Sequence, residues 1–145
     1  MKKFSLLILS VLLLSCSSDN NEDSVTKEGN FLEVYNGVAW RSGPDPGDCP
    51  WYAYSPEGTK TYECKEPFNG ECTEFTNLWG VPDIEFGYID TVLENSKNLL
   101  KLERVDSNGV SSIFSLSVSE DGNFLNYSND AGETAKRYKA SAPCK

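Results

Sequence analysis

Cysteines are the side chains of this chain whose type and number point most directly to chemistry. Four of them, Cys49, Cys64, Cys72 and Cys144, form an even set that suits either two disulfides or a zinc site. Zinc modules use closely spaced pairs of cysteines, often with histidine, whereas this chain has no such pairs and no His. We therefore expect two disulfides, which persist in oxidising compartments, and no metal site.

The pairing of these cysteines is not fixed by the sequence, because four cysteines can pair in three ways. We favour Cys64 with Cys72, because an Asn-Gly dipeptide between them is a strong turn signal. The remaining pair, Cys49 with Cys144, would then join the C-terminus to the early part of the fold.

Carboxylates are the remaining groups with acid–base chemistry to offer. Without His, the usual general base near neutral pH is missing. Acidic pairs such as Glu63 with Glu66 have the residue types that glycosidases use, but a chain with 22 Asp and Glu contains many such pairs by chance. No glycine-rich phosphate loop and no Gly-x-Ser-x-Gly motif occurs. We expect a protein that is not an enzyme and has no cofactor.

The charge balance limits the partners of the protein. Against 22 Asp and Glu stand 13 Lys and Arg, which gives a formal net charge of −9. Such an acidic surface repels the phosphates of nucleic acids, and no basic patch offsets it. We therefore exclude nucleic-acid binding.

Cys16 differs from the other cysteines because of what precedes it. Two lysines, an apolar run over residues 4–14 and a small residue form a secretory signal. The run is shorter than the ~20 apolar residues that a membrane-spanning helix needs. Residues 13–16, Leu-Leu-Ser-Cys, resemble the lipobox of bacterial lipoproteins. That resemblance implies that residues 1–15 are removed and that Cys16 carries a diacylglycerol and an acyl chain such as palmitate, a lasting membrane anchor.

The segment after the anchor, residues 16–28, is expected to be a flexible acidic linker, since its first half contains no large apolar residue. Its acidic residues, Asp19, Glu22 and Asp23, resemble the export tag that sends some lipoproteins to the outer face of the outer membrane. The resemblance implies a lipid-anchored protein of the bacterial outer membrane, exposed at the cell surface. A plain solvated linker is the alternative interpretation.

Residues 29–145 are long enough for one domain, and their pattern predicts an all-β fold. Apolar residues alternate along the chain, and turn residues interrupt it every ~8–12 residues, as in antiparallel sheets. A turn near residues 95–97 leads into Leu100 and Leu102. Strands are further predicted at 32–40, 51–54, 59–64, 72–75, 84–92, 110–118, 124–128 and 134–140. We expect about eight strands in up-and-down order, closed into a small barrel.

Two segments resemble the lipocalin-like domains of bacterial surface lipoproteins, Asn-Gly-Val-Ala-Trp at 36–40 and Lys-Arg-Tyr-Lys at 136–139. Lipocalins carry a Gly-x-Trp motif on the first strand, and here two residues separate Gly37 from Trp40. The resemblance implies that Trp40 closes one end of the barrel and that Arg137 stacks over its indole, a contact worth ~0.5–2 kcal/mol.

Two functions follow from this fold. In the first, a lipocalin-like barrel binds a small apolar or amphipathic ligand at the cell envelope through inward aromatic rings. The residues predicted to line it are Trp51, Tyr54, Trp79, Phe86 and Tyr88. In the second, those rings fill the interior, and a structural or interaction lipoprotein contacts an envelope protein or a glycan through its loops. An exposed patch of Trp51, Tyr52 and Trp79 would favour the second function.

Overall fold

The computed structural model describes residues 29–65 and 69–140. The predicted signal peptide, Cys16, the linker and Cys144 lie outside the described residues.

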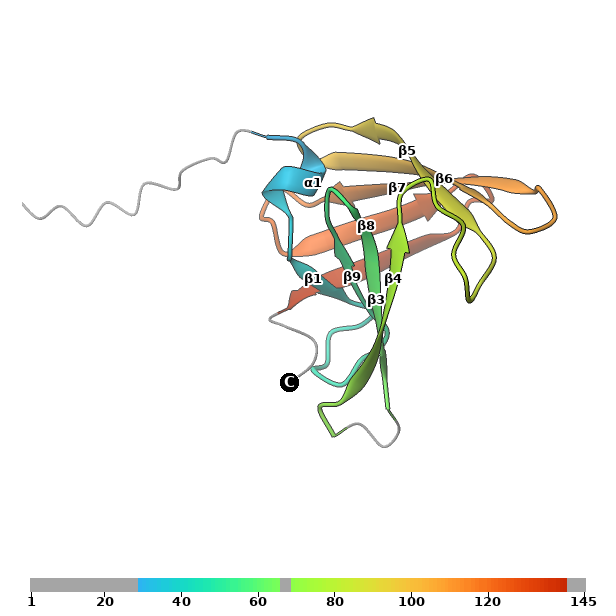
Figure 1. The fold of residues 1–145 in the computed structure, drawn as a ribbon. Coiled ribbons are helices and arrows are strands. Elements are labelled where there is room, and N and C mark those ends of the chain that lie inside the picture. The colour runs from blue at the N-terminus through green and yellow to red at the C-terminus, as the bar shows by residue number, and fades with distance from the viewer. Residues whose placement is uncertain (1–28, 66–68, 141–145) are drawn as a thin grey trace, which may run out of the picture.

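The described residues form a single antiparallel sheet of nine strands with one short helix (Figure 1). The helix is α1 (Phe31–Val34), and the strands are β1 (Ala39–Arg41), β2 (Trp51–Tyr54), β3 (Gly58–Cys64), β4 (Cys72–Leu78), β5 (Ile89–Asn95), β6 (Leu99–Val105), β7 (Ser111–Val118), β8 (Phe124–Asn129) and β9 (Thr134–Ala140). The predicted all-β antiparallel class is confirmed, with nine strands instead of about eight.

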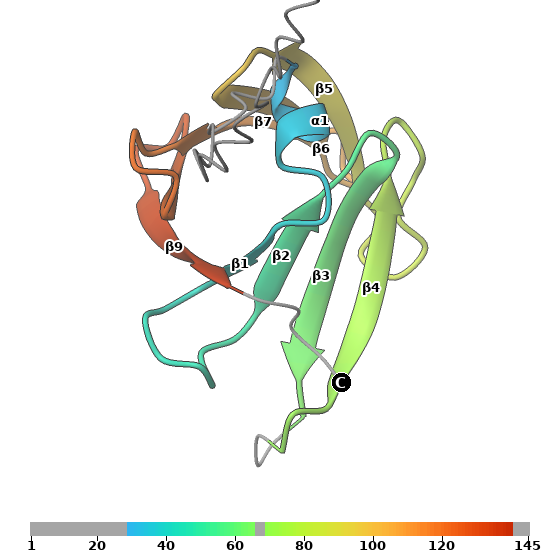
Figure 2. The ribbon, with the colours of Figure 1, turned by 90° about the vertical axis from the view of Figure 1, so that its left-hand side faces the viewer.

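The first and last strands along the described chain pair with each other, but the sheet does not close. Its strand order is β4-β3-β2-β1-β9-β8-β7-β6-β5, so β1 pairs with β9 as an up-and-down barrel requires. The sheet curls until β5–β7 face β2–β4 across the interior (Figure 2). β4 and β5 nevertheless remain edges with no ladder between them. The expected closed barrel is therefore replaced by a curled sheet with one seam.

Side chains and loop backbone bridge that seam. Asn77 Nδ2 on β4 donates to Asp90 Oδ2 on β5 at 3.0 Å, and the backbone N–H of Gly80 donates to the Asp90 carbonyl at 2.7 Å. Covering an edge in this way satisfies polar groups that would otherwise offer a template for aggregation.

The first predicted strand, 32–40, is wrong in its first half. Asn30 caps α1 with its side chain, which accepts from the backbone N–H of Glu33, while the Glu33 carboxylate accepts from the backbone N–H of Asn30. This reciprocal capping box satisfies two free donors and starts a helix. Leu32 is buried by the helix, and only residues 39–41 are a strand.

The predicted strand 84–92 is also shifted. Residues 79–88 form a loop, and β5 begins at Ile89. Asp83 Oδ1 accepts from the backbone N–H groups of Glu85 and Phe86 at 2.8 and 2.7 Å, and Gly87 adopts a φ of 68°. This turn interrupts the strand predicted from the apolar alternation, so residues 84–88 lie in a loop. Val110, the first residue of the predicted strand 110–118, lies in the turn before β7 and is 60% exposed.

The buried core lies at the end of the domain that α1 covers. Its fully buried members are Phe31, Trp40, Leu100, Leu102, Leu116 and Leu125. The leucines alternate along β6, β7 and β8 as the sequence pattern predicts, and each contributes about 1.5–3 kcal/mol on burial. We call this region the packed end.

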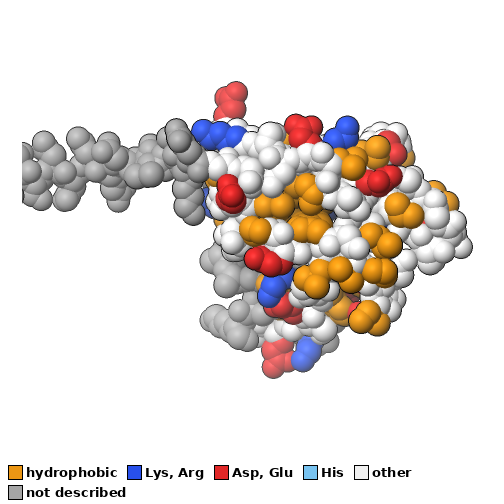
Figure 3. Space-filling view, turned by 45° about the horizontal axis from the view of Figure 1, so that its top comes forward, with side chains coloured by type: hydrophobic (Ala, Val, Ile, Leu, Met, Phe, Trp, Pro, Cys, Tyr) orange, Lys and Arg blue, Asp and Glu red, His pale blue; other side chains and the backbone are white. Residues whose placement is uncertain are grey.

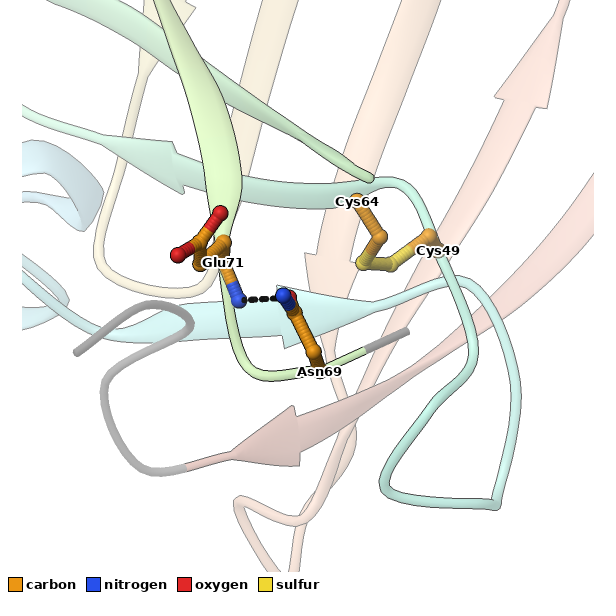
Figure 4. Close-up of a disulfide and its surroundings, with 4 residues drawn as sticks. All are labelled: Cys49, Cys64, Asn69 and Glu71. Carbon is orange, nitrogen blue, oxygen red and sulfur yellow. Dashed lines mark hydrogen bonds between the residues drawn. A yellow bond between two sulfur atoms is a disulfide. The ribbon is translucent and has the colours of Figure 1, made fainter. Parts of the chain in front are cut away.

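The predicted disulfide pairing is wrong, because Cys49 pairs with Cys64 (Figure 4). The β2–β3 register sets Trp51 opposite Tyr62, and the same register continued by two residues sets Cys49 opposite Cys64. Cys72 lies across from Cys64 on β4 and is itself disulfide-bonded. The Asn-Gly turn signal located the β3–β4 connection correctly, and there Asn69 Oδ1 accepts from the backbone N–H of Glu71 at 2.9 Å. β3, which carries Cys64, pairs with both β2 and β4, and the turn signal indicated only the pairing with β4.

Candidate functional site

A cavity of about 460 Å³ lies beside the packed end, between β2–β4 on one side and β5–β9 on the other, with the loop 79–88 in its wall. Its wall combines seven aromatic rings with polar and charged side chains. The rings belong to Tyr52, Tyr54, Phe75, Phe86, Tyr88, Phe114 and Tyr127. The other lining residues are Thr59, Thr61, Asn77, Asp83, Asp90, Arg104, Ser112, Asn129 and Arg137.

Three of the five residues predicted to face a ligand line this cavity. They are Tyr54, Phe86 and Tyr88. Trp51 does not, because alternate residues of β2 face opposite sides of the sheet and Tyr52 and Tyr54 take the inner side. Trp79 packs against the core instead, and its Nε1 donates to the Ser55 carbonyl at 3.0 Å.

The floor of the cavity, next to the packed end, is made by Tyr54 and Arg137. Tyr54 is 3% exposed and its ring meets Phe31 of α1 at a centroid distance of 6.2 Å. Arg137 lies opposite Leu125 in the β8–β9 ladder and donates a hydrogen bond from Nη1 to the Tyr54 hydroxyl. The floor therefore joins a cation and a phenol at the boundary of the apolar core.

Arg137 stacks on tyrosines and not on Trp40 as the lipocalin resemblance implied. Its guanidinium carbon lies 3.7 Å from the centroid of Tyr52 and 5.3 Å from that of Tyr127. Trp40 is fully buried in the packed end, where its ring meets Tyr35. No cation–π contact joins Arg137 to Trp40 among the described residues.

A second arginine stands in the opposite wall. Arg104 Nε and Nη2 each donate to an Asp90 carboxylate oxygen at 2.7 Å, and the guanidinium stacks 3.6 Å from the centroid of Tyr88. Asp90 is fully buried and also accepts from Asn77. Burial alone would lower the pKa of Arg104, but its hydrogen bonds to Asp90 and the attraction of that carboxylate raise the pKa above its ordinary value.

Sequence reasoning missed this arginine, although a signal was present. Arg104 follows Leu100 and Leu102 at two-residue spacing, so it lies on the inner face of β6 with them. Asp90 is its direct partner in the β5–β6 ladder. A charged residue on the same face of a strand as buried leucines points inward, and an inward-facing charge needs a counter-ion.

Two tyrosines of the cavity, Tyr54 and Tyr88, have a raised pKa and remain protonated donors. Burial raises the pKa of Tyr54, and the nearby Arg137 charge offsets only part of the rise. Burial also raises the pKa of Tyr88, again with partial opposition from an arginine, Arg104. Both phenols thus keep their protons well beyond neutral pH.

Two polar atoms in the wall lack partners within the described structure. Thr59 Oγ1 and Asn77 Oδ1 are buried without a hydrogen bond, and the two residues oppose each other in the β3–β4 ladder. Thr59 in turn opposes Tyr54 in the β2–β3 ladder. A buried polar atom left unpaired costs roughly 1–3 kcal/mol, so this row offers hydrogen bonds to a molecule in the cavity.

The mouth of the cavity lies at the loop 79–88. Phe86 is 51% exposed there and stacks on Tyr88 with centroids 6.0 Å apart. Ile84 of the same loop is fully exposed, and Val110 of the β6–β7 turn is 60% exposed. Figure 3 shows hydrophobic side chains gathered on one face of the molecule. In Figure 1, α1 and this loop lie at opposite ends of the domain.

Comparison of the chain with protein-family models, with curated proteins and with solved structures finds no match. Over residues 29–65 and 69–140, no three His, Cys, Asp or Glu side chains come together in a way that could hold a metal ion. The same residues include no helix of the length and apolarity that crossing a bilayer requires.

Proposed function

We propose that this protein binds a small amphipathic molecule in the cavity between the two halves of its curled sheet. The observation that carries the proposal is a cavity of about 460 Å³ lined by seven aromatic rings, with polar atoms that lack partners in its wall. Ligand sites of ~300–1,000 Å³ combine apolar walls with a few polar groups in this way. The curled sheet serves as the container, as a lipocalin barrel does, with its seam bridged by Asn77 and Asp90.

The proposed setting is the cell envelope, with the domain tethered through lipidated Cys16 to the bacterial outer membrane. The lipobox-like residues 13–16 and the acidic linker support this part of the proposal. α1 is the first described element, and in Figure 1 it lies at the opposite end of the domain from the loop 79–88. A tether at α1 thus leaves the mouth free to take up a ligand from the surroundings.

The alternative, a filled interaction module, has weaker support. The aromatic patch expected for it is absent from the surface, since Trp51 is 6% exposed, Tyr52 lines the cavity and Trp79 is half-buried. The exposed Ile84 and Val110 at the mouth are the features that favour contact with a protein or glycan.

Fluorescence titration with N-phenyl-1-naphthylamine, a neutral apolar probe, tests the binding function. The protein is used from residue 17 onward, which leaves out the predicted signal peptide and the lipidated Cys16, and with its disulfides formed. We expect saturable binding at one site. Thr61→Trp, which fills the cavity from β3, should abolish it.

Thr91→Trp is the matched control, because Thr91 is an exposed residue on the outer side of β5. It should bind the probe as the parent protein does. Absence of saturable binding to the folded parent protein, or equal binding by the Thr61→Trp variant, would contradict the proposed function.

A further inference from the structure

The two arginines of the cavity differ in how their charges are balanced. Arg104 gives two hydrogen bonds to Asp90, and this carboxylate neutralises it. Arg137 has no carboxylate within ion-pair distance among the described residues, and its one hydrogen bond goes to the neutral Tyr54 hydroxyl. The guanidinium of Arg104 therefore has a carboxylate partner, whereas that of Arg137 has none among the described residues.

This local charge is opposite to that of the whole chain. The protein has a net charge of −9, yet the cation that its cavity leaves unpaired is placed on the floor, against the apolar core. The other carboxylate in the cavity wall, Asp83, belongs to the mouth loop and accepts from backbone N–H groups of that loop. A partly desolvated cation is costly to leave unpaired, so the floor favours an anion.

The orientation of Arg137 leaves its donors accessible. Guanidinium N–H groups lie in the plane of the group, and stacking on Tyr52 covers a face of that plane, not its edge. Only Nη1 donates a hydrogen bond within the described structure. The remaining edge presents the fork of parallel donors that matches the two oxygens of a carboxylate.

Tyr54 supplies a second donor at the same point. Its hydroxyl oxygen accepts from Arg137, so its own hydrogen is free to donate. The side chain is 3% exposed, and the surrounding rings exclude water from any bond it makes. A hydrogen bond to an anion in such a site is stronger than one in water.

We propose that the ligand is a carboxylate-bearing amphiphile whose carboxylate is bound by Arg137 and Tyr54 on the cavity floor. This inference rests on the proposed function, since it names the class of molecule that the cavity takes. The apolar body of the ligand extends toward the mouth and contacts Phe75, Phe86 and Phe114. Near the carboxylate, Thr59 Oγ1 and Asn77 Oδ1, the two wall atoms without a hydrogen bond in the described structure, accept hydrogen bonds from further polar substituents.

The test compares two ligands of nearly the same shape, 2-naphthoate and its neutral amide, 2-naphthamide. Both are titrated at pH 7.5 and fixed ionic strength by isothermal calorimetry, with the protein from residue 17 onward. Charge-assisted hydrogen bonds are worth ~1.5–3 kcal/mol, so we expect 2-naphthoate to bind on the order of tenfold or more tightly than the amide.

Variants assign that preference to the floor. Arg137→Gln should reduce the preference for naphthoate to within about threefold while changing amide affinity much less. Lys136→Gln is the matched control, because Lys136 is an exposed cation of the same strand that lies over Phe124 on the outer face. It should keep the full preference. Tyr54→Phe keeps the ring and removes one donor, so it should weaken naphthoate several-fold, and it remains informative if the Arg137 variant does not fold.

The outcomes separate the inference from the function on which it rests. Binding of naphthamide without any preference for naphthoate overturns the carboxylate assignment and leaves a general binding cavity. Tighter binding of the cation 2-naphthylmethylammonium than of naphthoate also overturns it. Failure of all the naphthyl ligands and of the neutral probe to bind the folded protein overturns both proposals.

Discussion

The packed end and the cavity end of this domain are built from the same strands, but the first is filled with apolar side chains and the second surrounds an open space. On β6, Leu100 and Leu102 fill the packed end, and Arg104, the next residue on that face, stands in the cavity wall. On β7, Leu116 is fully buried, and Ser112 lines the cavity. One alternating pattern thus passes from apolar to polar within two to four residues.

This contrast shows how a small sheet can hold a cavity without collapsing. A void in an apolar interior is unfavourable, because the atoms that line it lose dispersion contacts. At the cavity end, the guanidinium of Arg104 stacks on Tyr88 and that of Arg137 on Tyr52, and Arg104 is fixed in turn by Asp90. The paired charges and stacked rings act as rigid walls, while the leucines supply the stability.

Leu102→Ala is the largest expected perturbation and tests the packed end. Leu102 is fully buried, and its truncation removes transfer free energy and leaves a void, so the free energy of unfolding should fall by about 3–4 kcal/mol. Urea denaturation followed by tryptophan fluorescence measures it. Leu93→Ala, at a position 48% exposed, should change stability by less than about 0.5 kcal/mol. Equal losses in the two variants would contradict the division into a packed and an open end.

Asp90→Asn is the corresponding change at the cavity end. It leaves Arg104 without its counter-ion, and because that side chain is 40% exposed, we expect a loss of about 2–3 kcal/mol rather than more. The same change adds positive charge to the interior, so affinity for 2-naphthoate should rise several-fold in the folded variant. Urea denaturation and calorimetry measure the two effects, and a parallel loss of stability and naphthoate affinity would contradict this view of the cavity.

Removing both partners of this ion pair sharpens the comparison. Asp90→Leu combined with Arg104→Met replaces a charged wall with an apolar one, and such replacements of buried pairs are often neutral for stability. The double variant should therefore regain most of what Asp90→Asn loses. It should also bind the neutral naphthyl probe at least as well as the parent protein does.

Local signals predicted those parts of the fold that depend on short-range chemistry. The predicted strands 124–128 and 134–140 match β8 and β9 closely. Asn108-Gly109 and Asp121-Gly122 form the turns before β7 and β8, because glycine in a tight turn admits the positive φ found at Gly109 and Gly122. The errors arose where one apolar alternation fits two structures. Leu32 and Val34 alternate as in a strand, yet Asn30 and Glu33 cap a helix.

The candidate site was predictable only in part, because it depends on register. Tyr54, Phe86 and Tyr88 were identified as aromatic residues of the right spacing, and they line the cavity. The pairing of Asp90 with Arg104 follows from which residues of β5 and β6 oppose each other, and a bulge between Val92 and Glu94 shifts that register farther along the ladder. No pattern within a single strand carries that information.

Asn30→Ala is the smallest expected change and separates α1 from the site. The variant removes the side-chain oxygen that accepts from the Glu33 N–H at 3.1 Å, and losing an N-cap of this kind costs about 1 kcal/mol. Because α1 covers the packed end, the loss should appear in the urea midpoint, whereas naphthoate affinity should stay within about twofold. Asn30→Asp, which keeps a capping oxygen, should restore the midpoint. If Asn30→Ala weakens ligand binding more than it weakens folding, the two ends are coupled through Phe31 and Tyr54, whose rings meet between them.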